Sequence, residues 1–181
     1  MMDTPSAWVA RWLPVAPAGD VLDLACGRGR HARLAAALHH PVMAVDRDPA
    51  ALLEAAGAGI VTRCIDLEGE GAAWPFDAAR FAAVIVTNYL HRPQFAHLAA
   101  ALQPGGMLIY ETFALGNEAY GKPSNPAFLL APGELLDMAR KHCLHVLAYE
   151  DGVTTAGRTA RIQRLCAIAP GFTLSSTPLE M

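Results

Sequence analysis

The fold of this chain follows from one stretch, Val-Leu-Asp-Leu-Ala-Cys-Gly-Arg-Gly-Arg at residues 21–30. A short apolar strand carries a carboxylate near its end, passes through a turn with two glycines, and leads into a helical pattern from Arg30 to about His39. The glycines let the backbone approach a ligand because no Cβ stands in the way. The first turn of the helix presents unpaired N–H groups to the same point. This arrangement is typical of the ligand-binding edge of a parallel α/β sheet.

Apolar runs alternate with helical patterns along the rest of the chain, which predicts a parallel sheet with crossover helices. Helices are expected at about 5–13, with Thr4 as cap, and at 30–39, 49–56, 95–102 and 134–142. Strands are expected at 21–25, 42–45, 60–65, 82–87, 107–112, 144–149 and 160–169. The last two strands are close enough in sequence to form a hairpin. We therefore predict a doubly wound, mostly parallel seven-stranded sheet with an antiparallel last strand.

The chain length of 181 residues suits one domain and is short for two. Within residues 1–181 we expect an N-terminal helix and lead-in over 1–18 and a loose tail over 170–181. The segment 116–132 contains three prolines and two glycines and is the longest irregular stretch. Long irregular segments in compact domains are often functional, so we expect it to serve as a lid.

Composition and charge exclude several classes of protein. The formal net charge of −3 gives no electrostatic reason to expect nucleic acid or an anionic membrane as a partner. No run of about 20 apolar residues predicts a membrane span, and the start of the chain lacks the features of a signal peptide, so a cytoplasmic location is expected. The four cysteines, at positions 26, 64, 143 and 166, include no C-x-x-C pair. We expect buried free thiols and no metal site.

Two cofactor classes compete for the glycine turn. Gly27, Gly29 and Ala32 satisfy G-x-G-x-x-G/A, the dinucleotide pattern. Asp46 ends the second expected strand, and a carboxylate there can accept hydrogen bonds from a ribose diol in either class of cofactor. These residues alone therefore do not exclude a nicotinamide dinucleotide as the cofactor.

A carboxylate in the first strand favours the other class. Asp23 lies four residues before the first glycine, where it would oppose an anionic pyrophosphate and would stabilise a cationic ligand. Asp66 and Glu111 lie near the ends of the third and fifth expected strands. With Asp23 and Asp46 they form an expected rim of four carboxylates. Such a rim favours a cationic ligand without phosphate.

Four segments together resemble the class I S-adenosylmethionine-dependent methyltransferases, from Val21 to about Ala169. They are 21–30, Val45-Asp46, Ile65-Asp66-Leu67 and 102–108 (Leu-Gln-Pro-Gly-Gly-Met-Leu). The resemblance implies that Asp46 holds the ribose and Asp66 the adenine amino group. The cofactor-binding residues expected from it are Asp23, Ala25, Cys26, Gly27, Gly29, Arg30, Asp46, Arg47, Asp66, Leu67, Asn88 and Tyr89.

Some features refine or depart from this resemblance. Residues 126–135 and 149–151 are similar to the tellurite-resistance group of these methyltransferases, a weaker match. Ala25 stands where the family usually has glycine, and Ala82 where an aspartate often precedes the fourth strand. Neither change removes an expected contact with the cofactor.

The catalytic residues stay unassigned, because methyl transfer is an in-line displacement that depends mainly on positioning. Candidates are Tyr89, whose ring face attracts a sulfonium cation, His91 as a base, Glu111 at the exit of the fifth strand, and Arg158 as a partner of an oxyanion. Residues 88–91 differ from Asn-Pro-Pro-Tyr, so methylation of nucleic-acid bases is disfavoured.

The sequence thus predicts methyl transfer from S-adenosylmethionine to a small-molecule acceptor, such as a thiol or a chalcogen oxyanion. A soft nucleophile of this kind needs little help from a base. Two alternatives stay open: a nicotinamide-linked oxidoreductase, and a non-catalytic cofactor-binding protein. The oligomeric state is not predicted.

Overall fold

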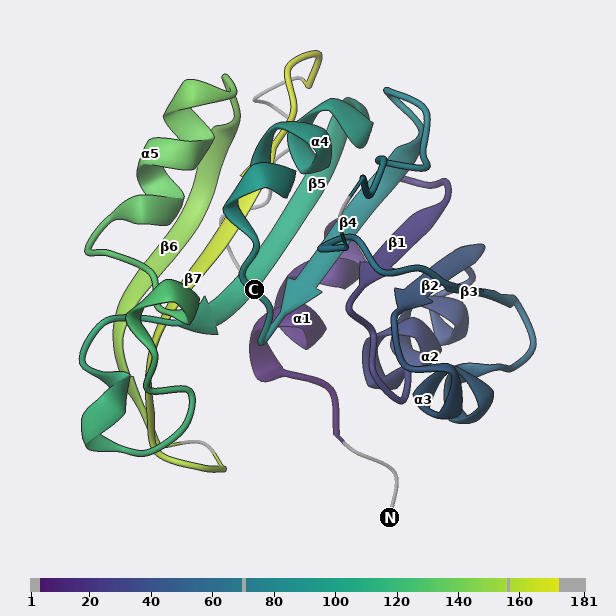
Figure 1. Ribbon diagram of the computed structural model, residues 1–181. Coiled ribbons are helices and arrows are strands. Elements are labelled where there is room, and N and C mark those ends of the chain that lie inside the picture. Colours follow the sequence, from purple (N-terminus) through teal and green to yellow (C-terminus); the bar gives the residue numbers. More distant parts are fainter. Residues whose placement is uncertain (1–3, 70, 156, 173–181) are drawn as a thin grey trace.

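The computed structural model describes residues 4–69, 71–155 and 157–172. Its centre is one seven-stranded sheet with the order β3-β2-β1-β4-β5-β7-β6 (Figure 1). The strands are β1 Val21–Leu24, β2 Val42–Asp46, β3 Ile60–Cys64, β4 Phe81–Thr87, β5 Leu102–Phe113, β6 His145–Thr154 and β7 Ala160–Ile168. Strands β1 to β5 pair in parallel, and β7 pairs antiparallel with both β5 and β6. The predicted mostly parallel sheet with an antiparallel last strand is confirmed.

Helices cover both faces of the sheet (Figure 1). The α-helices are α1 Ala7–Trp12, α2 Arg30–Ala37, α3 Pro49–Ala55, α4 Phe95–Ala101 and α5 Glu134–Lys141. Short 3-10 helices occupy Leu13–Val15, Arg92–Gln94, Asn117–Ala119 and Pro126–Phe128. One buried cluster joins α1, α2 and α3 to the sheet, and a second joins α4 and α5 to the opposite face.

The strand β4 at the centre of the sheet is apolar because it is covered on both faces. All seven of its residues are buried, as expected for a parallel strand between two helical layers. The chain moves from β1 to β2 and β3 on one side and then crosses to β4 and β5 on the other. The strand order therefore reverses between β1 and β4, where ligands bind in such sheets.

The start of the first helix differs from its prediction. Ser6, rather than Thr4, is the N-cap of α1, and its side-chain oxygen accepts a hydrogen bond from the Trp8 backbone N–H at 3.1 Å. The helix then gives way to the 3-10 turn at Leu13, because Pro14 cannot continue the hydrogen-bond ladder.

The expected tail begins with three ordered residues. The Pro170 carbonyl accepts a hydrogen bond from the Gly105 N–H at 3.0 Å, and the Phe172 ring lies 4.8 Å from that of His145. The rest of the expected tail lies outside the described residues. No helix in the described parts of the chain has the length and apolar character needed to cross a membrane.

The cysteines are only partly as predicted. Cys26 and Cys166 are buried, whereas Cys64 and Cys143 are exposed, so the expectation of four buried thiols is wrong for two of them. Cys64 lies on β3 at the edge of the sheet, and Cys143 lies in the turn after α5, where little covers either side chain. Among the described residues, no group of three or more His, Cys, Asp or Glu side chains is placed to hold a metal ion.

Candidate functional site

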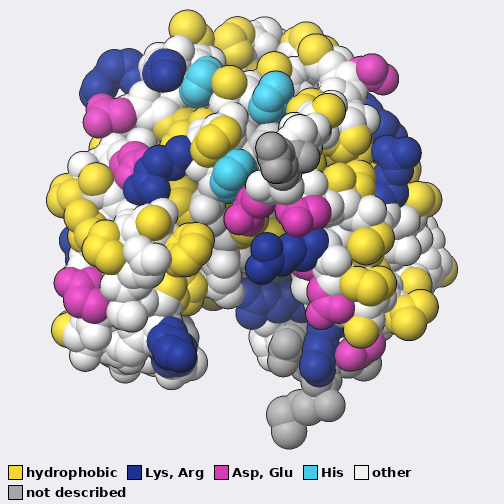
Figure 2. Space-filling model, viewed as in Figure 1, with side chains coloured by type: hydrophobic (Ala, Val, Ile, Leu, Met, Phe, Trp, Pro, Cys, Tyr) yellow, Lys and Arg dark blue, Asp and Glu magenta, His cyan; other side chains and the backbone are white. Residues whose placement is uncertain are grey.

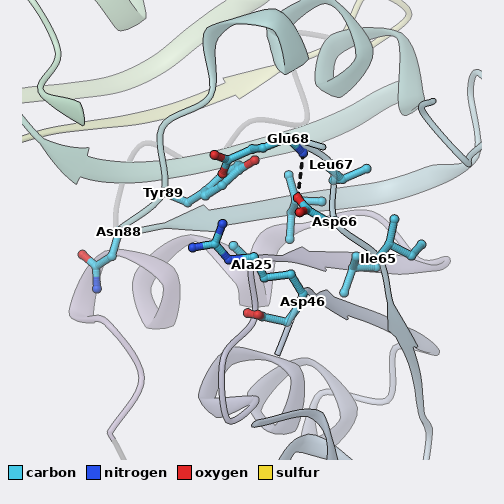
Figure 3. Close-up of a pocket in the computed structure, with 11 residues that line it drawn as sticks. Ala25, Asp46, Ile65, Asp66, Leu67, Glu68, Asn88 and Tyr89 are labelled. Atoms are coloured by element: carbon cyan, nitrogen blue, oxygen red, sulfur yellow. Dashed lines mark hydrogen bonds between the residues drawn. The ribbon is translucent and has the colours of Figure 1, made fainter. Parts of the chain in front are cut away.

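A cavity of about 270 Å³ opens at the carboxyl ends of β1, β2 and β4, where the strand order reverses (Figure 3). Seven residues expected at the cofactor site line it: Ala25, Asp46, Arg47, Asp66, Leu67, Asn88 and Tyr89. Three further lining residues, Leu24, Val45 and Ile65, belong to the segments that carry the resemblance but were not expected as contacts, and a fourth, Glu68, lies outside those segments. The topology thus brings together side chains from three strand ends and the segment after β3.

The glycine turn follows Ala25 at the edge of this cavity and contains several residues in a left-handed backbone conformation. Ala25 and Gly27 both have φ of 53°, and Gly29 has φ of 76°. The turn is tied to β2, because the Cys26 N–H donates to the Val45 carbonyl at 3.0 Å. Ala25 adopts a backbone conformation that costs a residue with a Cβ about 1–2 kcal/mol, which explains why glycine is usual there in the family it resembles.

The two glycines have different structural roles. A Cβ built on Gly29 would lie 2.6 Å from the Cβ of Ala55, so this glycine allows α2 to pack against α3. A Cβ built on Gly27 would meet no described atom within 4 Å, so space is open beside its backbone. Gly27 is therefore the position where a ligand can approach the main chain closely.

Asp46 joins the glycine turn to the end of β2. Its Oδ2 accepts a hydrogen bond from the Gly27 N–H at 2.7 Å, and its Oδ1 accepts one from the Asp48 N–H at 3.0 Å. A carboxylate has about four lone-pair positions, so both oxygens keep the capacity to accept hydroxyl donors. Asp46 is thus pre-oriented to receive a diol at the cavity.

The opposite wall of the cavity carries two more carboxylates. Asp66 orients the segment after β3, because its Oδ1 accepts a hydrogen bond from the Glu68 N–H at 2.9 Å. The Glu68 side chain lies against Tyr89 (Figure 3). Burial, followed by the Glu68 charge, raises the pKa of Tyr89 above its usual range, so the phenol stays neutral. Glu68 was missed because its Gly- and Ala-rich loop carries no motif.

Asp23 lies beneath the cavity rather than on its wall. It is 1% exposed, and burial raises its pKa to about 7, with Asp46 adding to the increase and the Ala32 backbone N–H and Arg30 opposing it. Its Oδ2 has no hydrogen-bond partner among the described residues. Cys26, Gly27, Gly29 and Arg30 also do not line the cavity. A buried, unpartnered acceptor is costly and calls for a donor from a ligand.

A neutral histidine connects the N-terminal segment to the end of β4. His31 is 1% exposed; its Nε2 accepts a hydrogen bond from the Ser6 N–H at 3.0 Å, and its Nδ1 lies 3.4 Å from the Thr87 Oγ1. Because Nε2 accepts, the proton of the neutral ring belongs on Nδ1. Burial, and to a smaller extent Arg30, lowers the pKa of His31 to about 3. His31 therefore connects Ser6 to Thr87 at the end of β4 without adding a charge.

A second cavity, of about 510 Å³, meets the first at Asn88, which lines both. Its remaining lining residues come from the end of β5 and the segment after it: Phe113, Lys122, Pro123, Ser124, Asn125 and Phe128. Asn88 has φ of 55°, and its N–H donates to the Glu111 carbonyl at 2.9 Å. This conformation, which asparagine tolerates better than most residues, places the amide at the junction of the two cavities.

The segment 116–132 forms a wall of the second cavity and is held at several points. Asn117 is fully buried; its Nδ2 donates to the Pro123 carbonyl at 2.9 Å, and its Oδ1 accepts from the Arg161 N–H at 3.0 Å. The Leu115 N–H also donates to the Leu130 carbonyl at 2.9 Å, which closes the base of the segment. A role for this segment as a lid stays a prediction.

Glu111 is not part of the cavity rim, so that prediction is wrong. The side chain is 8% exposed, and its Oε2 accepts a hydrogen bond from the Arg164 Nε at 2.6 Å. Arg164 also donates from Nη1 to the Glu150 Oε2 at 3.0 Å. The charge of Glu111 is thus compensated within the β5-β7-β6 part of the sheet. The rim contains Asp46, Asp66 and Glu68 instead.

Two other catalytic candidates lie away from the junction. His91 precedes the 3-10 helix at Arg92–Gln94, where its carbonyl accepts the Gln94 N–H at 3.0 Å, and its side chain lines neither cavity. Arg158 is exposed on the hairpin, and its guanidinium donates to the Lys122 carbonyl. His91 as a base and Arg158 as a direct oxyanion partner are therefore not supported by their positions.

Comparison with known proteins supports the class predicted from the sequence. Residues 21–106 match the family model described as a methyltransferase domain, whereas no curated protein sequence matches the chain. Among solved structures, TehB from Haemophilus influenzae has a TM-score of 0.73 at 16% identity, covering 91% of this chain and 62% of that one. An S-adenosylmethionine-dependent methyltransferase from Mesorhizobium loti has a TM-score of 0.70 at 16% identity, covering 88% of this chain and 95% of that one.

The same fold also serves another reaction. The [4+2]-cyclase SpnF has a TM-score of 0.68 at 15% identity, with 90% of this chain and 78% of that one covered. The fold alone therefore does not define the chemistry, and the match over residues 21–106 carries the assignment. The family-model match and the structural similarity together support a class I S-adenosylmethionine-dependent methyltransferase. The class predicted from the sequence is confirmed.

The residues of the first cavity fit S-adenosylmethionine as the cofactor. Asp46 and Asp66 supply acceptors for hydroxyl and amino groups, and the buried Asp23 Oδ2 lacks a donor among the described residues. The open space beside the Gly27 backbone provides the close approach that a ligand needs. Three carboxylates against the single cation Arg47 suit a positively charged ligand better than a pyrophosphate.

Proposed function

We propose that this protein transfers a methyl group from S-adenosylmethionine to a small-molecule acceptor whose nucleophile needs no general base. One observation carries the proposal: the cavity that meets the cofactor cavity at Asn88 has no Asp, Glu or His among the described residues that line it. A thiol or a chalcogen nucleophile forms a reactive anion near neutral pH without the help of a base and so satisfies this condition. An amine or alcohol would need a base that this cavity lacks.

In this proposal the chain acts by binding and orientation. The bound cofactor supplies a methyl group on a cationic sulfur. Asp46 accepts hydrogen bonds from the ribose, and Asp66 accepts one from the adenine amino group. Tyr89, kept neutral by burial and Glu68, lines the first cavity, and Asn88 lies between donor and acceptor. Holding two reactants in line removes much of the entropic barrier of a displacement.

Binding and turnover test the proposal together. Calorimetry should show S-adenosylmethionine binding and no comparable binding of NADH. With labelled donor, methylation should favour thiols and selenols over amines and alcohols by at least tenfold in kcat/KM, because only the former reach their anionic form unaided. NADH binding without S-adenosylmethionine binding, or a preference for amines, contradicts the proposal.

A variant at the junction provides the matched control. Asn88→Gly keeps the left-handed backbone conformation and removes only the amide. We expect kcat with thiols to fall by about tenfold or more, a loss of about 1.4 kcal/mol in the transition state, while the affinity for S-adenosylhomocysteine changes less than threefold. Loss of cofactor affinity with unchanged kcat would place Asn88 wholly in the cofactor cavity.

A further inference from the structure

The second cavity contains a cation without a counter-charge. Lys122 lines it and forms no ion pair with any residue that the structure describes. None of the other described lining residues is acidic. The nearby Arg161 is, by contrast, neutralised by Asp151, with their charged atoms 2.5 Å apart. Lys122 is therefore available to a ligand in the cavity.

The backbone around Lys122 is fixed in place by its neighbours. The Arg158 guanidinium donates to the Lys122 carbonyl, and the Asn117 Nδ2 donates to the carbonyl of Pro123. Gly121, with φ of 126°, allows the first contact, because a Cβ there would lie 2.7 Å from the Arg158 Nη2. Arg158 makes no ion pair with a described residue either, so its charge adds to the positive potential at this wall.

The rest of the cavity is largely apolar. Phe113 extends from the end of β5, Phe128 ends the 3-10 helix Pro126–Phe128, and Pro123 lies in the same wall. Phe128 is 50% exposed, so its ring is open to a ligand in the cavity. A volume of about 510 Å³ lies within the range of sites for small organic ligands.

The surface around the hollow carries further cations. Figure 2 shows the molecule hollowed beyond the carboxyl ends of β4 and β5, with Lys and Arg side chains on both sides and Asp and Glu side chains interspersed on the right-hand side. The positive charges of Lys122 and Arg158 at this wall attract an anion to the second cavity.

We infer that the acceptor is an amphipathic organic anion, which places its anionic group at Lys122 and its apolar body against Phe113 and Phe128. The inference rests on the proposed function and adds the acceptor class. An inorganic oxyanion is too small to contact Lys122 and fill the aromatic walls at once. During transfer the nucleophile–methyl bond forms as the methyl–sulfonium bond breaks, and the negative charge of the nucleophile cancels the positive charge of the sulfonium, so that a methylated acceptor atom and the neutral thioether S-adenosylhomocysteine remain. The separate anionic group at Lys122 keeps its charge.

Equilibrium binding tests the inference without turnover. The probes are 4-ethylbenzoate and its neutral analogue 4-ethylbenzamide, titrated into the full chain with S-adenosylhomocysteine present. We expect the benzoate to bind at least tenfold more tightly than the benzamide. This ratio should fall below threefold in Lys122→Gln and stay near its original value in Lys122→Arg, because only the charge is removed in the first variant. Lys141→Gln, on the exposed side of α5, should leave the ratio unchanged.

A second variant tests the apolar wall. Phe128→Ala should weaken both aromatic probes by a similar factor of about five to ten and leave the benzoate-to-benzamide ratio intact. Equal affinities in the unmodified protein overturn the inference. So does a charge preference that persists in Lys122→Gln.

Turnover separates this inference from the proposed function. With 4-mercaptobenzoate and 4-methylbenzenethiol as acceptors, we expect the charged thiol to have at least tenfold higher kcat/KM, mainly through a lower KM. Methylation of both thiols at equal kcat/KM overturns the acceptor class and leaves thiol methylation standing. Preferential binding of the benzoate with no thiol methylated supports the anion site and contradicts the proposed nucleophile.

Discussion

Asp46 shows how one residue can serve structure and ligand at once. Its two carboxylate oxygens accept the N–H groups of Gly27 and Asp48 at 2.7 and 3.0 Å, so the side chain holds the glycine turn while it faces the cavity. The neighbouring Asp48 has a different role, because its Oδ1 caps α3 through the Ala50 N–H at 2.9 Å. Two aspartates two residues apart can therefore be compared directly.

We expect Asp46→Ala to weaken S-adenosylmethionine binding by at least tenfold. The loss of charge-assisted hydrogen bonds to a diol corresponds to about 1.4 kcal/mol or more. Asp48→Ala is the control: it should cost about 1 kcal/mol of stability through the lost cap and leave the affinity unchanged. Calorimetry measures the affinity and denaturant titration the stability. Unchanged affinity in Asp46→Ala refutes the ribose assignment.

At the scale of elements, the glycine turn combines a packing requirement with a binding requirement. Gly29 permits the contact between α2 and α3, whereas Gly27 faces open space. Both residues have positive φ, so both substitutions by alanine carry a backbone cost of about 1–2 kcal/mol.

Gly29→Ala should destabilise the protein by about 2–4 kcal/mol, because overpacking against Ala55 adds to the backbone cost. Gly27→Ala should reduce the stability only by the backbone cost. It should also weaken cofactor binding, because the added methyl group blocks the close approach of the cofactor to the main chain. Thermal unfolding and calorimetry on both variants separate the two effects. Equal losses of stability would show that the helix contact accommodates the extra methyl group.

At the scale of the whole molecule, two buried titratable groups set opposite dependences of stability on pH. Burial raises the pKa of Asp23 to about 7, whereas an unfolded aspartate titrates near 3.9. Native Asp23 therefore keeps a proton that the unfolded chain releases, and its stabilising contribution is lost as the pH rises from about 4 to 7. His31, whose pKa is lowered to about 3, stays neutral while the unfolded imidazole takes up a proton below about pH 6.5. Its contribution is lost as the pH falls from about 6.5.

The two contributions should nearly cancel between about pH 4 and 6.5. Asp23→Asn removes the Asp23 contribution and leaves that of His31. The free energy of unfolding of this variant should therefore fall as the pH is lowered, by roughly 1.4 kcal/mol per pH unit relative to the unmodified protein. His31→Gln should give the opposite slope. Urea titrations at pH 4.5, 5.5 and 6.5 measure both, and parallel pH profiles in all three proteins would contradict the assignment.

Local sequence determined the parts of the fold and site that depend on neighbouring residues. The stretch 21–30 encodes a strand, a glycine turn and a helix in immediate succession, so the cofactor turn and its class were predictable. Asp46 is the last residue of β2 and Asp66 lies two residues after the end of β3, and the carboxyl ends of parallel strands meet at one edge of the sheet. The position of these two side chains at the first cavity could therefore be predicted without knowledge of contacts between residues distant in sequence.

Tertiary structure alone decided which charges act at the site and where an acceptor can lie. Glu111 is neutralised by Arg164, 53 residues away in sequence, because β7 inserts antiparallel beside β5. Lys122 is left without a described counter-charge beside Phe113 and Phe128, because the fold returns the segment 116–132 to the end of β5. Such pairings depend on the order of strands in the sheet, which hydrophobic periodicity does not specify. The donor site was therefore evident in the sequence, and the acceptor cavity emerged only from the packing.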